Sequence, residues 1–144
     1  MSTANEALAT RYFEELCNGR KPEVADEIFA ANHVHHDPSS PWVGAGPGPM
    51  KQLVSTYQTG FPDAHWAIDS MLSAGDTVVA RWTGSGTHRG DLAGIPPTGK
   101  SVSVAGIMIF RIANGQIAES WDVWDTLGML QQLGVVPALA KGAA

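Results

Sequence analysis

The chain has 144 residues, of which 44% are hydrophobic and 16% are charged. This length and composition fit a single globular domain over residues 1–144 and exclude an intrinsically disordered chain. Nine Lys and Arg residues are scattered along a chain with 14 Asp and Glu residues and a net charge of −5. This distribution argues against nucleic acid as a partner, because phosphate binding depends on clustered basic side chains.

Cysteine content and hydropathy point to a compartment. Cys17 is the single cysteine, so no disulfide can form within the chain, which suits a reducing environment. The first residues lack the charged start and apolar core of a signal peptide, and no apolar run is long enough to cross a membrane. We therefore expect a soluble, cytoplasmic protein.

The first half of the chain is predicted to be helical. Apolar residues recur at spacings of three and four over residues 4–18, which predicts a helix, and a second, short helix is expected over residues 22–30. Gly and Pro dominate residues 39–49, which predicts a loop. A third helix is predicted within residues 48–62 and ends at Gly60 and Pro62.

The second half reads as strands. Four runs of β-branched and aromatic residues are separated by turns that contain Gly, and they cover residues 64–75, 76–90, 100–115 and 116–125. A last helix is predicted over residues 126–134. Helices followed by consecutive strands predict an α+β domain in which the helices cover one face of a curved, mostly antiparallel sheet.

One hairpin can be given a register. Asn114-Gly115 is a strong turn signal, and pairing Arg111 with Glu119 across it places complementary charges opposite one another. This register puts Met108 opposite Asp122, and a slip of one residue would move both to the other face. If Met108 faces inward, Asp122 does too.

Asp122 is the leading candidate for chemistry. A carboxyl group buried among apolar side chains has a raised pKa, as a group that abstracts a proton next to a carbonyl requires. The residues alone leave an equal alternative, in which Asp122 is an ionised, hydrogen-bonded structural anchor. Asp125 stands directly before the last predicted helix, and we expect it to cap that helix.

Two motif-rich stretches support a family resemblance. The segment "GTHRGDLAGIPPTGK" and the pattern "IFRIANGQIAESWDVWDTLGMLQQLG" resemble those of SnoaL-like polyketide cyclases, also called ester cyclases, in the nuclear transport factor 2-like superfold. The resemblance covers nearly the whole chain. It implies a cone-shaped α+β barrel, cystatin-like in its curvature, whose helices enclose an apolar pocket.

The resemblance also implies an activity. Members of this family close a ring by an intramolecular aldol reaction without metal or cofactor, and their acid–base aspartate aligns with Asp122. A histidine commonly stands at the position of Met108, where this chain has methionine. The family histidine that precedes Asp-Pro lies near the pocket mouth, so His36 is carried over as a catalytic candidate, with His35 as a weaker substrate-binding choice.

Other polar candidates have competing interpretations. His88, in the "GTH" motif, either polarises a carbonyl oxygen or stabilises a turn. The cluster His33, His35 and His36 suggests a metal site, but the remaining ligands of a closed shell are missing, so we expect no metal.

Aromatic residues and methionines are candidates for the pocket lining. A flat, apolar ligand would fit a pocket built from such side chains, and the alternative is that they form core and oligomer interface. The candidate substrate-binding residues of this kind are Trp66, Trp82, Met108, Phe110 and Trp124.

These observations favour a cofactor-independent enzyme that uses Asp122 on an apolar carbonyl compound, and the resemblance implies a ligand like an aromatic polyketide. The alternatives are a hydrolase or isomerase on the same fold, or a non-catalytic domain that binds a hydrophobic ligand. The surplus of Trp and the uncovered sheet face predict a homodimer or higher oligomer formed through the sheet.

Overall fold

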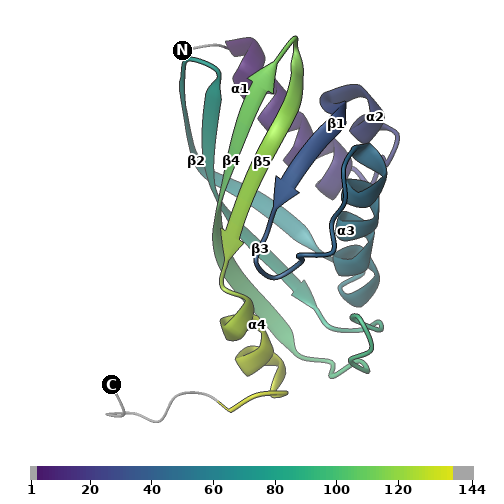
Figure 1. The fold of residues 1–144 in the computed structure, drawn as a ribbon. Helices are drawn as coiled ribbons and strands as arrows, with labels where there is room; N and C mark the ends of the chain where they lie inside the picture. Colours follow the sequence, from purple (N-terminus) through teal and green to yellow (C-terminus); the bar gives the residue numbers. More distant parts are fainter. Residues whose placement is uncertain (1–2, 138–144) are drawn as a thin grey trace.

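Three helices precede most of the sheet and lie on one of its faces in the computed structural model, which describes residues 3–137 (Figure 1). The first, α1 (Thr3–Arg11), continues into the π-helical segment η1 (Tyr12–Asn18), so the helix predicted over residues 4–18 is confirmed. The others are α2 (Val24–Ile28) and α3 (Pro47–Gly60). A last helix, α4 (Thr126–Leu133), follows the sheet, and Asp125 caps it by accepting a hydrogen bond from Gly128 N at 2.9 Å.

The sheet has five strands in the order β1-β5-β4-β3-β2. Four of them match the predicted runs: β2 (His65–Ala74), β3 (Thr77–Thr87), β4 (Ser101–Ala113) and β5 (Gln116–Trp124). These four pair antiparallel, whereas β1 (Phe29–His36) pairs parallel with β5. The prediction of a mostly antiparallel α+β domain is confirmed.

The prediction of a helix over residues 22–30 is wrong at its end, because residues 29 and 30 already belong to β1. Helix α2 stops at Ile28, and Phe29 already pairs with Ile117 of β5. Tertiary pairing overrides local propensity here, because the edge of the sheet offers unpaired backbone groups to this segment. Strand β1 was hard to recognise because its inward positions hold His33 and His35 where an apolar pattern was expected.

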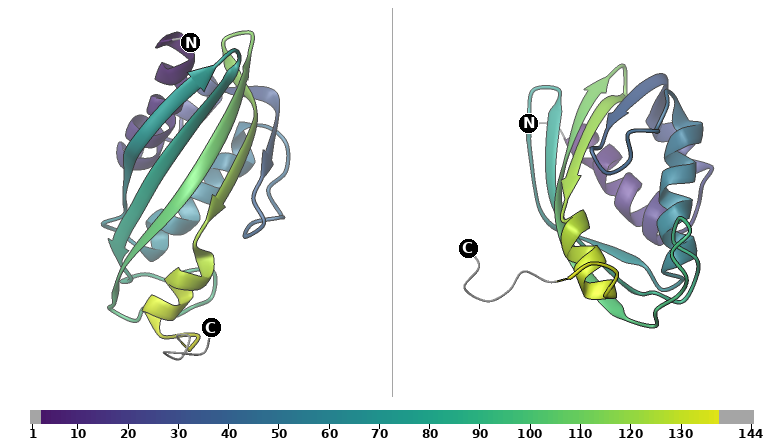
Figure 2. Two further views of the ribbon diagram at one scale, coloured as in Figure 1. Left: turned by 90° about the vertical axis from the view of Figure 1, so that its left-hand side faces the viewer. Right: turned by 60° about the horizontal axis from the view of Figure 1, so that its bottom comes forward.

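Strong bending of the sheet creates the interior. Strands β2, β3 and β4 curve around the helices, and α4 lies beyond the end of β5 (Figure 2). The concave face and the helices share one core, in which Phe13, Phe29 and Phe110 are fully buried. A second apolar cluster, built around Phe61 and Met129, lies where α4 meets the ends of the strands.

The predicted hairpin register is confirmed. Arg111 pairs with Glu119 and Met108 with Asp122, and a bulge after Arg111 leads into the turn. The guanidinium Nη2 of Arg111 lies 3.2 Å from Glu119 Oε1 on the outer face. Met108 and Asp122 consequently both point toward the interior, where their exposed fractions are 0% and 8%.

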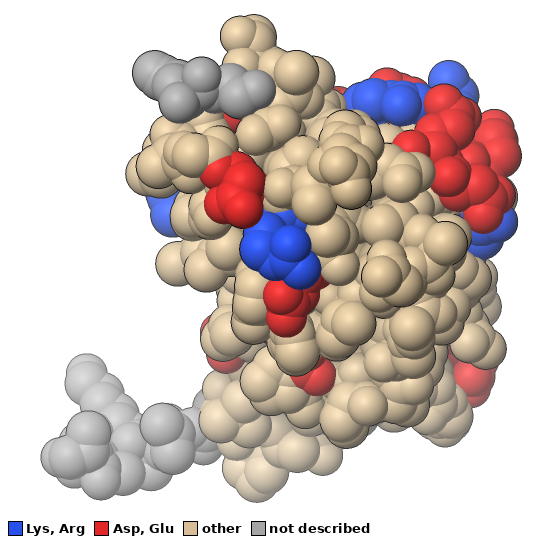
Figure 3. All heavy atoms as spheres, turned by 45° about the horizontal axis from the view of Figure 1, so that its top comes forward, with Lys and Arg blue, Asp and Glu red and all other residues tan. Residues whose placement is uncertain are grey.

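Charged side chains form small mixed groups on the surface that Figure 3 shows, with wide uncharged areas between them. Ion pairs of the described chain join Arg11 with Glu15 and Glu27, and Lys51 with Asp26. No helix within residues 3–137 is both long and apolar enough to cross a membrane.

Candidate functional site

A pocket lies between the concave face of the sheet and helices η1, α3 and α4. It contains about 620 Å³ of empty space, including the part of its mouth that is open to solvent. Apolar and aromatic side chains make up most of its wall, with a few polar groups among them, as is usual for small-molecule sites. Its ionisable wall residues within the described chain are Tyr12, Asp37, Tyr57, His65 and Asp122.

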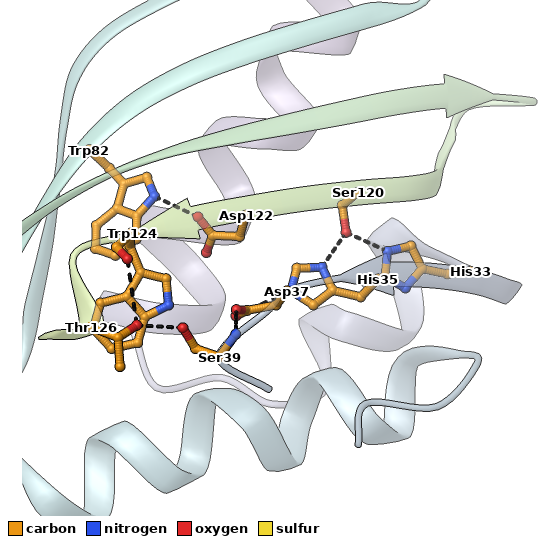
Figure 4. Close-up of polar contacts among 9 residues, drawn as sticks. All are labelled: His33, His35, Asp37, Ser39, Trp82, Ser120, Asp122, Trp124 and Thr126. Carbon is orange, nitrogen blue, oxygen red and sulfur yellow. Dashed lines mark hydrogen bonds and ion pairs between the residues drawn. The ribbon is translucent and has the colours of Figure 1, made fainter. Parts of the chain in front are cut away.

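Asp122 is the central polar group of this wall (Figure 4). It projects inward from β5, and its Oδ1 accepts a hydrogen bond of 3.1 Å from the indole Nε1–H of Trp82 on β3. Burial raises the pKa of Asp122 to about 8, because an ionised carboxylate is poorly solvated there. The hydrogen bond from Trp82 opposes this shift, and the nearby charge of Asp37 adds to it.

The three predicted pocket tryptophans do line the cavity. Trp66, Trp82 and Trp124 come from three different strands, and the rings of Trp82 and Trp124 lie 6.4 Å apart. Gly106 on β4 makes this arrangement feasible, because it pairs opposite both residues and leaves room for the indole of Trp82. A Cβ at this position would lie 2.5 Å from Trp82 Cζ2 and 2.7 Å from Trp124 Cβ.

We expect Gly106→Ala to lower the free energy of unfolding by about 1–3 kcal/mol, because one added methyl group overpacks the wall beneath two rigid indoles. Urea unfolding followed by Trp fluorescence measures the change. Gly48→Ala in α3 is the matched control, since no atom lies within 4 Å of its added Cβ. A Gly106→Ala protein as stable as its parent would contradict this close packing.

Asp37 is a buried pocket residue that we did not predict as functional. It follows β1, its side chain is 2% exposed, and its Oδ1 accepts the backbone N–H of Ser39 at 2.8 Å. Its Oδ2 lies 3.9 Å from Nε2 of His35. The alternation of side chains along this segment could have indicated Asp37, because the side chains of residues 33, 35 and 37 project from the same side of an extended chain.

Two histidines of β1 share one hydroxyl group deeper in the core (Figure 4). Nε2 of His33 lies 2.8 Å and Nδ1 of His35 lies 2.7 Å from Oγ of Ser120. A hydroxyl group has one hydrogen, so at least one imidazole must donate its N–H to Ser120. Burial lowers the pKa of His33 to about 4, which makes this ring neutral at physiological pH.

The structure does not bring His36 to the pocket. Its ring lies on the outer face of the sheet, stacked on Trp121, and its Nε2 lies 2.7 Å from Oε2 of Glu119. This hydrogen bond is the main reason that the pKa of Glu119 is lowered. Because side chains alternate along β1, His36 points away from the face that carries His33 and His35. We therefore leave His36 out of the proposed catalytic set.

His88 lies outside the pocket wall as well. It is fully buried after β3, and its Nδ1 accepts the backbone N–H of Thr98 at 3.1 Å. Its ring packs against Phe61 at 5.5 Å. These contacts fit the alternative in which His88 stabilises the turn between β3 and β4.

Met108 and Phe110 also differ from their predicted placement. Both are fully buried in the core beside the pocket and neither belongs to its wall.

The three histidines His33, His35 and His36 do not converge on one point, since His36 faces outward. Within residues 3–137 no group of three or more His, Cys, Asp or Glu side chains is arranged to hold a metal ion.

This arrangement can carry acid–base chemistry on an apolar compound. Asp122 and Asp37 present two carboxyl groups to one pocket, and three tryptophans form much of its apolar wall. Burial raises the pKa of Tyr57 to about 12, so its hydroxyl group stays protonated and can donate a hydrogen bond.

Known proteins resemble this chain over most of its length. A family model described as SnoaL-like polyketide cyclase matches residues 7–133. The aklanonic acid methyl ester cyclase DnrD of Streptomyces peucetius is 30% identical over 132 residues, which cover 88% of each chain. The nogalonic acid methyl ester cyclase of Streptomyces nogalater is 30% identical over 117 residues, covering 81% of this chain and 87% of that one. The structure of TsrD from Streptomyces laurentii superposes with a TM-score of 0.81 at 30% identity, covering 94% and 99%.

Proposed function

The chain belongs to the SnoaL-like polyketide cyclase family, and we propose that it is a cofactor-independent cyclase that closes a ring in an apolar, carbonyl-bearing polyketide by aldol chemistry. Asp122 is a group that transfers a proton in this reaction. Trp66, Trp82 and Trp124 hold the flat, apolar part of the substrate.

One observation carries the proposal: a nearly buried carboxyl group, held by an indole N–H, stands in the wall of an apolar pocket. A structural anchor would be ionised and surrounded by hydrogen-bond donors or cations. Within residues 3–137, the indole N–H of Trp82 is the side-chain donor to Asp122, and burial raises the pKa of Asp122 to about 8. A carboxyl group with a pKa near the working pH is suited to proton transfer.

Aldol closure needs groups of this kind. A proton leaves a carbon next to one carbonyl group, the resulting enolate carbon bonds to a second carbonyl carbon, and the oxygen of that carbonyl takes up a proton. Each proton transfer is faster when a positioned side chain gives or takes the proton. The pocket holds both reacting ends of one molecule together, which lowers the entropic cost of ring closure.

The direct test is to incubate the protein with aklanonic acid methyl ester, the compound in the name of its 30% identical relatives. An aldol closure keeps the mass and changes the chromatographic retention, so the expected result is a new peak of unchanged mass that a protein-free sample lacks. If the protein binds this ester, as seen by Trp fluorescence, without closing a ring, the proposal fails for this substrate.

A non-catalytic domain that binds hydrophobic ligands is the second candidate, and Met108 is the observation in its favour. Methionine at this position supplies no ionisable group opposite Asp122. Under this alternative, esters and hydrocarbons of similar shape bind the pocket equally well and leave it unchanged. Comparing binding with turnover for the same compound separates the two functions.

We also propose that the chain forms a homodimer through the outer face of the sheet. Cross-strand neighbours on this face form an apolar row across four strands: Leu72, Val79, Ile109 and Trp121. Ile107 and Val123 pair beside this row, with exposed fractions of 49% and 64%. A contiguous apolar surface of this kind is typical of protein interfaces.

We expect Val123→Lys to shift the protein from dimer to monomer at micromolar concentration, because it places a charge on this apolar surface beside Ile107. Light scattering gives the mass, and circular dichroism should show an unchanged fold, since Val123 is exposed within one chain. Gln52→Lys on the exposed side of α3 is the control. A parent protein that is already monomeric would contradict the proposed dimer.

A further inference from the structure

We propose that Asp37 is the base of the reaction and that Asp122 is its acid, so that two carboxyl groups divide the proton transfers between them. This assignment rests on the proposed cyclase function. It is drawn from the placement of Asp37 in the pocket wall and from its contacts.

The ionisable side chains of the pocket wall differ in what each can do. The pKa of Tyr12 is raised well above its ordinary value by burial, and that of Tyr57 to about 12, so both hydroxyl groups remain protonated. His65 is exposed where β2 begins. Asp37 is the remaining carboxyl group of the described wall beside Asp122, and the residue as a whole, backbone included, is 7% exposed.

The surroundings of the two carboxyl groups differ. Asp37 Oδ1 accepts a backbone N–H from Ser39, and its Oδ2 faces Nε2 of His35 at 3.9 Å. Asp122 lies among indole rings with one neutral N–H donor. The charge of Asp37 also acts on Asp122 and favours its protonated form, as happens when two carboxyl groups share a site.

His35 is the positioning residue in this arrangement. Its Nε2 is buried without a hydrogen-bond partner in the described chain, and Asp37 Oδ2 is the carboxylate atom near it. If Ser120 donates to Nδ1 of His35 and accepts from His33, the proton of His35 lies on Nε2. The chain His33–Ser120–His35 then directs an N–H toward Asp37.

The proton balance of this scheme closes. The Asp37 carboxylate takes a proton from carbon, and the C–H electron pair becomes the enolate. The enolate carbon bonds to the second carbonyl carbon, whose C=O π pair moves to oxygen, and that oxygen takes the proton of Asp122. Asp37 is then protonated and Asp122 ionised, and transfer of one proton from Asp37 to Asp122 through solvent restores the starting state.

Deuterium exchange separates the two roles. Asp122→Asn blocks the last proton transfer, so the enolate returns to substrate and takes up deuterium from D₂O. We expect this variant to exchange the carbon-bound hydrogens of aklanonic acid methyl ester faster than the protein-free reaction, while ring closure is lost. Adding Asp37→Asn should lower that enzymatic exchange by about 10²–10⁴-fold, the usual contribution of a general base.

Control variants keep the test independent of folding. Asn at position 37 can still accept the Ser39 N–H, so the fold should persist, and melting curves verify this. Asp37→Glu, which restores a carboxylate, should recover part of the exchange in the Asp122→Asn background. The exposed Asp76→Asn should leave the exchange of that background unchanged.

Two results would overturn the assignment while the cyclase function stands. One is a parent protein that closes the ring while its Asp122→Asn variant shows no exchange above the protein-free rate, which would make Asp122 the base. The other is a folded double variant that exchanges as fast as Asp122→Asn alone. A parent protein that closes no ring contradicts the proposed function itself, and the assignment of Asp37 falls with it.

Discussion

Replacing Asp122 by Asn should lower the rate of ring closure by about 10²–10⁴-fold without lowering the melting temperature at pH 7, the combination expected when a buried acid–base group is removed from an intact pocket. Asn has nearly the shape of Asp, and its side-chain oxygen can still accept the hydrogen bond from Trp82 Nε1. The amide has no proton that it can give to or take from substrate. The chemical step therefore loses this group while the wall of the pocket keeps its form.

Stability separates this result from the structural alternative. If Asp122 were an ionised anchor, Asn would break a buried charge-assisted contact and lower the free energy of unfolding by roughly 1–3 kcal/mol. Turnover and melting must therefore be measured on the same preparation. Activity that is fully retained, or that falls only in proportion to unfolding, would remove Asp122 from the mechanism and favour the ligand-binding domain.

The sequence predicted the hairpin and its consequences because several local signals agree there. The Asn114-Gly115 turn, the Arg111–Glu119 pair and the alternation of β5 all require one register, and that register places Asp122 inside. Strand β1 lacked such agreement. Its apolar residues are few, its partner β5 is nearly ninety positions away in the chain, and parallel pairing leaves no turn signal.

The residues of the candidate site likewise differ in whether the sequence could place them. Asp122 and the three tryptophans lie on predicted strands, and the hairpin register was enough to place Asp122 on the inner face, whereas alternation alone did not decide between pocket and interface for each Trp. Asp37 and His35 depend on β1, so their position became visible only through the pairing of β1 with β5. His36 was chosen as a catalytic candidate from the family motif. It follows the inward-facing His35 by one residue on β1, so its side chain points to the outer face.

The contribution of Asp122 to the stability of the protein should fall as the pH rises from about 4 to 8, whereas that of His33, whose pKa burial lowers to about 4, should rise over the lower part of this range. The pKa of this carboxyl group is about 8 in the folded protein and near its ordinary value of 3.8 in the unfolded chain. Between these values the folded state holds a proton that the unfolded state has released. Raising the pH therefore favours unfolding, by up to about 1.4 kcal/mol for each pH unit.

The difference between parent and Asp122→Asn protein isolates this effect. Other groups titrate in both proteins and cancel, and any fixed change in packing shifts the whole curve by a constant. We expect the free energy of unfolding of the parent to decline relative to the variant by about 3 kcal/mol between pH 5 and pH 7. Urea unfolding at pH 5, 6 and 7, followed by Trp fluorescence, measures both curves.

Asp63→Asn provides a control of opposite sign. Hydrogen bonds from Thr87, the backbone N–H foremost, lower the pKa of this exposed carboxyl group. A lowered pKa contributes stability that is lost only as the pH falls through the acid range, so this variant should run parallel to the parent from pH 5 to pH 7. Parallel curves for the parent and Asp122→Asn over the same interval would show that Asp122 is ionised in the folded protein, because only a carboxyl group that is protonated in the pocket gives the two proteins different slopes.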